Sequence, residues 1–458
     1  YFSPVLSEDN KTIYAIKHNV EGFMNDTYEF VIVEIKIETK KEKVIRTMYG
    51  FGSSLGISPD GKWLVFSGNN SPEILSAQNN ELYILNPKTG EEKWISEKID
   101  NHAALPVFDS ETSYLYFLVD NWERIAVHRF NIDRETVEEI YSGDSMINSF
   151  DVDSDQGLIL INASQKEDLS VLMLYDFVYK ELKTLWKTNE KLLAGRKLAE
   201  TEEIKYSGFE GKEIQGWIVK PPNFDENKKY PTIVEIHGGP HATWSPFGGS
   251  MWFEFQYFAS QGYVVFYCNP RGSSGRGYDF RNIFQQWGTE PANDILTGLD
   301  KVAEKGYVDK DNLFITGGSY GGYMTAWIIG HDQRFKAAVP LRGVYNLVSF
   351  WSTTDVTKLI KDEIGSFPWE DLDKNWEFSP IAYVNKTKTP TRIIHSEKDF
   401  RVSISQAEEY FASLLKLGTT AELIRYPEEG HELSRSGKPL HMKDRLEKII
   451  EWFEKYKS

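Results

Sequence analysis

The stretch FITGGSYGGYMT, residues Phe314–Thr325, places four glycines around one serine where an apolar run gives way to a helix-like pattern. Within it, Gly317 to Gly321 reads G-x-S-x-G. This is the pattern of a nucleophile elbow, a sharp strand-to-helix turn that exposes a serine hydroxyl. Glycines flank such a serine because the tight turn leaves no room for side chains. An ordinary glycine-rich turn is the alternative, and the surrounding sequence distinguishes the two.

Strands alternate with helices around this turn. Apolar runs such as PTIVEIHG and YVVFYCNP are separated by helical patterns such as ANDILTGLDKVAEKG. Continuous apolar strands are typical of a parallel sheet that is buried on both faces. We therefore expect residues 196–458 to form an α/β-hydrolase domain with a doubly wound, mostly parallel sheet.

Residues 1–195 follow a different pattern, a turn followed by an alternating strand, which recurs four times. The acidic turn residues are Asp9, Asp60, Glu111 and Asp155, at spacings of 51, 51 and 44 residues. Each unit continues into a second pair of strands, so it is predicted to form a four-stranded blade. Antiparallel repeats of about 40–50 residues are typical of a β-propeller. We expect an all-β propeller domain with about four visible blades, a β-sandwich being the alternative.

Composition excludes several classes of protein. Hydrophobic residues make up 40% and charged residues 26% of the 458 positions, which is typical of a folded, water-soluble chain. The net charge of −16 disfavours nucleic acid and anionic lipid as partners. No apolar run approaches the roughly 20 residues that span a bilayer. The only cysteine, Cys268, lies in an apolar strand pattern and fits a reducing, cytoplasmic location.

A serine hydroxyl needs a neighbouring base and a carboxylate that orients the base. In the α/β-hydrolase order both follow the serine in the chain. Among the later histidines, His431 is the one expected in a loop just past a strand, so we select it as the base. The candidate acids Glu397 and Asp399 both follow the strand pattern in TRIIHSEKDFRV.

Two backbone amides are candidates for binding the oxyanion of a tetrahedral intermediate. The amide of Tyr320 directly follows the serine. The second is expected from the loop in VEIHGGPH, where Gly238 and Gly239 allow a close approach, and we favour the amide of Gly239. A purely structural turn is the alternative reading of this loop.

Together these motifs resemble the prolyl oligopeptidase family of serine peptidases, and within it the acylaminoacyl peptidase branch. The resemblance is carried by HGGP, NPRGSSGRGYDF, GGSYGGYMT, SPIAYV, HSEKDFRV, YPEEGH and IIEWFEKY. It implies Ser319 as nucleophile, Asp399 as acid and His431 as base. It also implies that Arg401 binds a substrate peptide carbonyl, with a surface ion pair as the alternative.

The resemblance also implies a propeller that admits short peptides and excludes folded proteins. Phe350 and Trp351 follow the strand after the elbow, where family members build a side-chain pocket, although core packing explains them equally well. Family propellers have seven or eight blades, so an upstream segment is expected to be absent from this chain, a shorter cap being the alternative. Tyr320 stands where prolyl oligopeptidase itself has Asn, which argues against a strict proline specialist.

The sequence thus favours a serine oligopeptidase for short or N-acylated peptides that needs no metal or cofactor. An esterase and a dipeptidyl or aminopeptidase of the same fold are alternatives. The dipeptidyl peptidases' glutamate-rich motif is not recognisable here. A propeller binding protein with an inactive hydrolase domain is the alternative from another class. Short peptides are the expected partners, and self-association through edge strands is possible.

Overall fold

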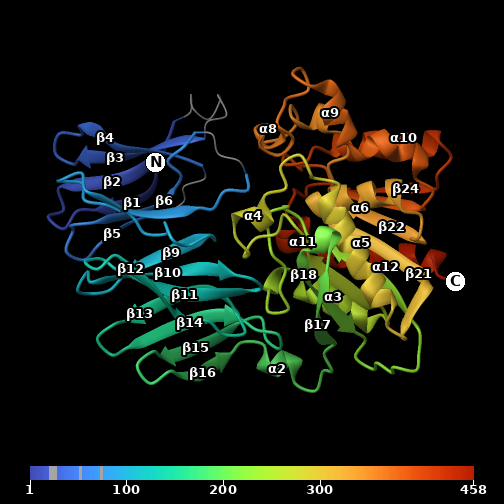
Figure 1. Ribbon diagram of the computed structural model, residues 1–458, viewed down its shortest axis with the longest axis horizontal. Helices are drawn as coiled ribbons and strands as arrows, with labels where there is room; N and C mark the ends of the chain where they lie inside the picture. The colour runs from blue at the N-terminus through green and yellow to red at the C-terminus, as the bar shows by residue number, and fades with distance from the viewer. Residues whose placement is uncertain (20–27, 51–53, 73–75) are drawn as a thin grey trace. The chain divides into compact units, whose positions relative to one another are not determined.

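The computed structural model describes residues 1–19, 28–50, 54–72 and 76–458 (Figure 1). The chain divides into two compact units. The first comprises Tyr1–Ala194 together with Phe247–Gly249 and Ser274–Asp279. The second comprises Gly195–Pro246, Ser250–Ser273 and Phe280–Ser458.

The described part of the first unit contains four antiparallel sheets, each built from four strands. The first two sheets are β1 (Phe2–Leu6), β2 (Thr12–His18), β3 (Glu29–Lys36) and β4 (Glu42–Tyr49), then β5 (Leu55–Ile57), β6 (Leu64–Gly68), β7 (Glu81–Leu85) and β8 (Glu92–Trp94). The other two are β9 (Ala103–Phe108), β10 (Tyr114–Asn121), β11 (Arg124–Asn131) and β12 (Thr136–Tyr141), then β13 (Met146–Asp153), β14 (Leu158–Ser164), β15 (Val171–Asp176) and β16 (Glu181–Lys187). Strands that are adjacent in the sequence are therefore adjacent in each sheet, as in propeller blades.

Neighbouring sheets bury their faces against one another, as strand β10 shows. Leu115 and Phe117 pack in the cluster shared with the preceding sheet, whereas Tyr116 and Leu118 pack in the cluster shared with the following sheet. Successive side chains of a strand point to opposite faces. A central strand with both faces buried therefore belongs to two cores.

The repeated turns use one recurring set of hydrogen bonds. The hydroxyl of Ser7 donates to Asp9 Oδ1 over 2.7 Å, and that of Ser58 donates to Asp60 Oδ1 over 2.6 Å. In the third unit Asp109 takes the position of these serines and accepts the amides of Ser113 and Tyr114. The third turn is therefore organised by Asp109, and not by Glu111, which the repeat spacing indicates.

The second unit is built on one eight-stranded sheet with the order β17-β18-β20-β19-β21-β22-β23-β24. Its strands are β17 (Glu200–Ser207), β18 (Glu213–Lys220), β19 (Tyr230–Ile236), β20 (Val264–Asn269), β21 (Val308–Gly318), β22 (Ala337–Leu341), β23 (Thr391–Ser396) and β24 (Ala421–Tyr426). The pairs β17–β18 and β18–β20 are antiparallel, and every other pair is parallel. This mixed sheet with a parallel majority matches the predicted α/β-hydrolase fold.

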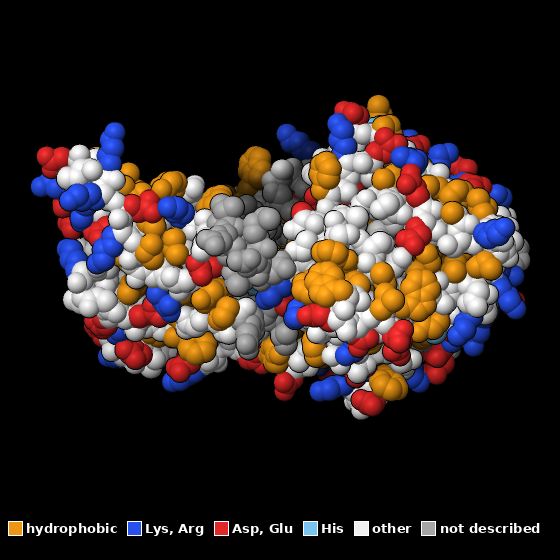
Figure 2. Space-filling model, turned by 90° about the horizontal axis from the view of Figure 1, so that it is seen from above, with side chains coloured by type: hydrophobic (Ala, Val, Ile, Leu, Met, Phe, Trp, Pro, Cys, Tyr) orange, Lys and Arg blue, Asp and Glu red, His pale blue; other side chains and the backbone are white. Residues whose placement is uncertain are grey.

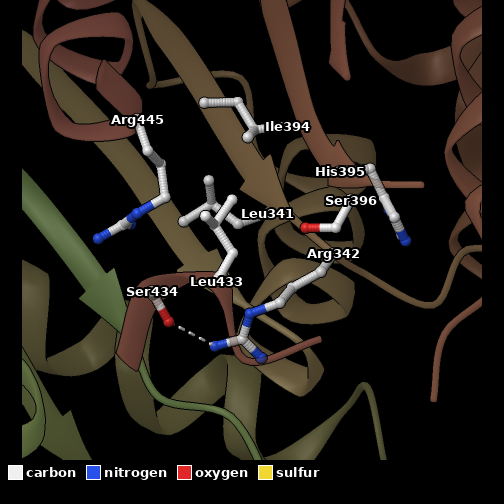
Figure 3. A pocket seen from close by; sticks show the side chains of 8 residues that line it. All are labelled: Leu341, Arg342, Ile394, His395, Ser396, Leu433, Ser434 and Arg445. Carbon is white, nitrogen blue, oxygen red and sulfur yellow. Dashed lines mark hydrogen bonds between the residues drawn. The ribbon is translucent and has the colours of Figure 1, made fainter. Parts of the chain in front are cut away.

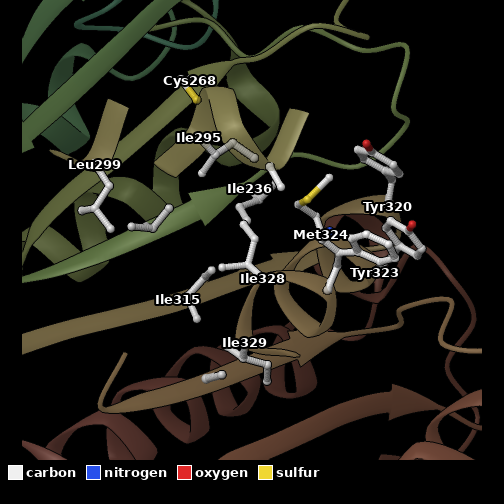
Figure 4. Packing of buried hydrophobic residues seen from close by; sticks show 14 of the residues in the cluster. Ile236, Cys268, Ile295, Leu299, Ile315, Tyr320, Tyr323, Met324, Ile328 and Ile329 are labelled. Atoms are coloured by element: carbon white, nitrogen blue, oxygen red, sulfur yellow. The ribbon is translucent and has the colours of Figure 1, made fainter. Parts of the chain in front are cut away.

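Helices cover both faces of this sheet. The helices α5 (Glu290–Ala303) and α6 (Tyr320–His331) contribute Ile295 and Ile328 to one core, which also contains Ile315 of β21 (Figure 4). The helices α3 (Gly249–Ser260) and α12 (Pro439–Tyr456) pack on the other face, where Phe314 of β21 is buried. Helix α10 (Ile404–Lys416) packs against β23 and α6.

Charged side chains of both signs are interspersed on the face shown in Figure 2. Many of the exposed ones pair locally, for example Lys443 with Glu447 on α12 and Lys361 with Glu370. Among the described residues, no helix combines the length and the apolar character that crossing a membrane requires.

A buried ion pair joins the two helices that cover one face of the large sheet. Arg445 of α12 donates from Nη1 to Glu254 Oε1 of α3 over 2.9 Å, and both side chains are 4% exposed. Burial and the neighbouring Glu254 raise the pKa of Glu235, a second buried acid, well above its ordinary value, which favours the neutral form of this carboxyl. One cation therefore faces one carboxylate inside the protein.

We expect Arg445→Met to destabilise the second unit by about 3–5 kcal/mol, because it leaves the Glu254 carboxylate buried without its partner. Denaturant unfolding followed by tryptophan fluorescence measures the change. Lys443→Ala on the same helix removes an exposed pair and should cost no more than about 0.5 kcal/mol. Equal midpoints for the two variants would contradict the prediction.

Candidate active site

Ser319 occupies a strained turn between β21 and α6. Its φ is 61° and its ψ is −120°, a conformation that costs free energy for a residue with a side chain. The backbone crowds around it: a Cβ on Gly317 would lie 2.6 Å from the carbonyl oxygen of Ile236, and a Cβ on Gly321 would lie 2.1 Å from the same atom. Both positions therefore require glycine, and the turn presents the serine hydroxyl as an elbow.

The structure brings Ser319, His431 and Asp399 into one hydrogen-bonded chain. Ser319 Oγ lies 3.0 Å from His431 Nε2, and His431 Nδ1 lies 2.7 Å from Asp399 Oδ2. The three residues follow the ends of three different strands, β21, β24 and β23. Glu397, the other candidate acid, instead accepts a hydrogen bond from Arg425 Nε.

Asp399 is held as a carboxylate in spite of its burial. Burial by itself raises the pKa of this group, but hydrogen bonds from His395 and His431 and from the Val402 amide keep it well below the ordinary value. Its Oδ1 accepts the amides of Val402 over 2.8 Å and Arg401 over 3.0 Å. The remaining oxygen, Oδ2, therefore faces the His431 ring with a fixed orientation and a negative charge.

The loop that contains Gly238 and Gly239 packs directly against the elbow. A Cβ on Gly238 would lie 2.9 Å from the carbonyl oxygen of Gly318, and Gly239 has a φ of 119°, a value that favours glycine. The ring of His237 lies 2.8 Å from Gly238 O and 2.9 Å from Ser273 Oγ, and burial lowers its pKa to about 4. A neutral histidine thus anchors this loop.

Tyr320 is the first residue of α6, so its amide has no carbonyl partner one turn earlier in the helix. Such an amide has no acceptor within its own helix. The phenol of Tyr320 is buried and donates to the carbonyl oxygen of Trp287. The side chain of Tyr320 thus belongs to the core, and the role of its amide remains a prediction.

The three predicted substrate-binding residues lie in different environments. Arg401 forms an ion pair with Asp355, and both side chains are about half exposed. Phe350 is 1% exposed and lies within a hydrophobic cluster of the second unit, as core packing requires. Trp351 is partly buried and contacts the ring of Trp369 edge-on. Their roles in binding remain predictions.

The sequence pattern does not single out Arg342, which follows β22. Its Nη1 lies 3.1 Å from His431 Nε2, and its Nη2 donates to Ser434 Oγ over 3.2 Å (Figure 3). The side chain is buried, with a positive φ of 41° at its backbone. A positive φ at a residue other than glycine is uncommon, and the sequence does not reveal it.

Comparison with known proteins places the chain among peptidases. Residues 250–458 match the model of the prolyl oligopeptidase family, and residues 180–307 match that of acetyl xylan esterase. The chain is 32% identical to an uncharacterized peptidase of Bacillus subtilis, YuxL, over 96% of this chain and 76% of the relative. It is 30% identical to dipeptidyl-peptidase 5 of Schizosaccharomyces pombe over 88% of this chain, and it spans 59% of that relative's length.

A solved structure shares the fold. The acylaminoacyl peptidase of Pyrococcus horikoshii matches 99% of this chain with a TM-score of 0.85 and 25% sequence identity, and the chain covers 70% of its length. The correspondence therefore includes both the repeated antiparallel sheets and the large mixed sheet.

Gly321→Ala should destabilise the second unit by about 1–3 kcal/mol, because the new methyl group would overlap the Ile236 carbonyl oxygen. Thermal unfolding monitored by circular dichroism measures the effect. Gly306→Ala is the matched control, since no heavy atom lies within 4 Å of its added Cβ. An unchanged melting temperature for Gly321→Ala would show that the elbow tolerates a side chain there.

Proposed function

Because the chain belongs to the prolyl oligopeptidase family of serine peptidases, we propose that Ser319 is its nucleophile, His431 its general base and Asp399 the acid that orients the base. The hydrogen-bonded chain from Ser319 Oγ through the His431 ring to Asp399 Oδ2 is the observation that carries this proposal. A carboxylate at Nδ1 leaves Nε2 free to accept the serine proton.

In the proposed reaction, His431 Nε2 takes the proton of Ser319 while Oγ attacks the substrate carbonyl. The amides of Tyr320 and Gly239 stabilise the oxyanion that forms. The imidazolium then gives its proton to the leaving amine, and an acyl-enzyme remains on Ser319. In the second half, His431 takes a proton from water, the hydroxide attacks the ester, and Ser319 Oγ recovers its proton as the acid product leaves.

We propose short peptides, including N-acylated ones, as the substrates. The similarity to an acylaminoacyl peptidase supports this class. Arg401 would bind a substrate carbonyl after exchanging its ion pair with Asp355, and Trp351 would contact a substrate side chain more readily than the buried Phe350. The propeller domain, residues 1–195, would restrict access to the hydrolase domain, residues 196–458.

Two other activities of the same site have specific support. The relative named dipeptidyl-peptidase 5 favours release of dipeptides from a free amino terminus. The match of residues 180–307 to acetyl xylan esterase favours ester hydrolysis. Both activities would use the same nucleophile. Dipeptide release differs in the acyl group that is transferred to Ser319, and ester hydrolysis differs in its leaving group, an alcohol in place of an amine.

A fluorophosphonate probe should label one residue, Ser319, and Ser319→Ala should lose both labelling and turnover by about 10⁴-fold or more. Mass spectrometry of the labelled peptide identifies the site. An unlabelled protein that keeps its native circular dichroism spectrum would contradict the proposal and favour a binding protein with an inactive hydrolase domain.

A substrate panel separates the three activities. We expect acetyl-aminoacyl anilides and short peptides to be cleaved, because amide hydrolysis needs the oxyanion donors and the leaving-group proton that the site provides. Free dipeptidyl anilides and nitrophenyl esters are the comparison substrates, and Ser319→Ala is the control for each. If esters were hydrolysed and no amide substrate were cleaved, peptides would be ruled out as the substrates.

A further inference from the structure

A buried guanidinium without an anionic partner lies against the proposed base. Arg342 is 8% exposed. Among the described residues, no carboxylate oxygen lies within 4.0 Å of its guanidinium nitrogens, the distance that defines an ion pair. Three other buried arginines differ, since Arg271 pairs with Asp294, Arg392 pairs with Glu422 and Arg445 pairs with Glu254. Burying a cation without a counter-ion costs free energy, which suggests that Arg342 has a role beyond stabilising the fold.

The guanidinium is fixed in place by the elbow and by one hydroxyl. A Cβ on Gly318 would lie 3.0 Å from Arg342 Nη2, so the group packs flat against the backbone beside Ser319. The Arg342 amide donates to the carbonyl oxygen of Ile394 over 2.9 Å, and Ser434 Oγ accepts from Nη2. The side chain lines a cavity of about 10 Å³, which has room for about one water and not for a substrate group (Figure 3).

The contact with His431 has a definite chemical meaning. An arginine side chain has donors only. A donor at 3.1 Å from His431 Nε2 therefore requires a lone pair on that nitrogen, which leaves the ring proton on Nδ1, facing Asp399 Oδ2. This is the tautomer that can accept the proton of Ser319.

We propose that Arg342 is a positioning residue that holds the His431 ring neutral in the resting enzyme, with the lone pair of Nε2 shared between the guanidinium and the Ser319 hydroxyl. The proposal rests on the catalytic roles proposed above. When Nε2 takes the serine proton, both groups become donors and their hydrogen bond must break. Arg342 then keeps its bond to Ser434, so the guanidinium acts on the resting base and not on the transferred proton.

The charges around the ring support this role. Burial and the charge of Arg342 lower the pKa of His431 below the ordinary imidazole value, while Asp399 and Glu432 act in the opposite direction. Burial, followed by repulsion from Arg435 and Arg445, lowers the pKa of Arg342 to about 10, so it stays charged at neutral pH. His395 is a further titratable group here, and its Nε2 lies 3.5 Å from Asp399 Oδ2.

The test is the pH dependence of kcat/KM and of fluorophosphonate labelling. The wild-type acid limb should lie below the ordinary imidazole pKa of about 6.5. Arg342→Met and Arg342→Gln remove the charge and should move that limb upward by about one pH unit. Arg342→Lys keeps the charge and should restore the limb to near its wild-type position.

A merely structural role for Arg342 would lower the melting temperature and the rate without moving the acid limb, and that result would overturn the inference. If Arg342→Met does not fold, Arg342→Gln and Arg342→Lys provide the same comparison. Nitrogen NMR of the histidines in the wild-type protein needs no variant, and a proton on His431 Nε2 at neutral pH would also overturn it. Labelling of Ser319 with an unchanged limb contradicts this inference alone, whereas absence of labelling contradicts the proposed function as well.

Discussion

The carbonyl oxygen of Ile236 and the Cα of Gly321 approach so closely that no side chain fits between them. This contact presses the start of α6 against the end of β19, and it places the loop of Gly238 beside Ser319. The strained backbone of Ser319 persists because the packed strands on both sides over-determine it. The position of Ser319, and with it the distance from its hydroxyl to His431, depends on this packing of the elbow.

Chain order predicts much of the site, although it leaves Glu397 and Asp399 as alternative acids, and the family resemblance selects Asp399. Parallel strands bring their carboxyl ends to the same edge of a sheet, so residues that follow β21, β23 and β24 meet in space although 112 residues separate Ser319 from His431. The glycines of the elbow are also readable, because close backbone contacts exclude every other residue. The order of the α/β-hydrolase sheet therefore carries most of the information.

Other features could not be predicted, each for a local reason. Asp109 organises the third turn because an aspartate can replace a serine as acceptor, a substitution that residue spacing does not reveal. Arg342 contacts the base from a position with a positive φ, and no motif in the sequence marks that position. Phe350 and Trp351 are adjacent in the chain, yet one is in the core and the other partly exposed, because a short helix turns them apart. Periodicity alone does not resolve such single positions.

The alternating burial of β10 means that destabilising one sheet of the first unit also destabilises the sheets packed against it. Tyr116 and Phe117 are neighbours in the chain, yet they support opposite junctions between sheets. Weakening one sheet thus loosens two contacts at once, and the disturbance passes along the series from neighbour to neighbour. In such a series, a sheet that packs against a neighbour on each face is stabilised by two interfaces, whereas a sheet with a single neighbour is stabilised by one.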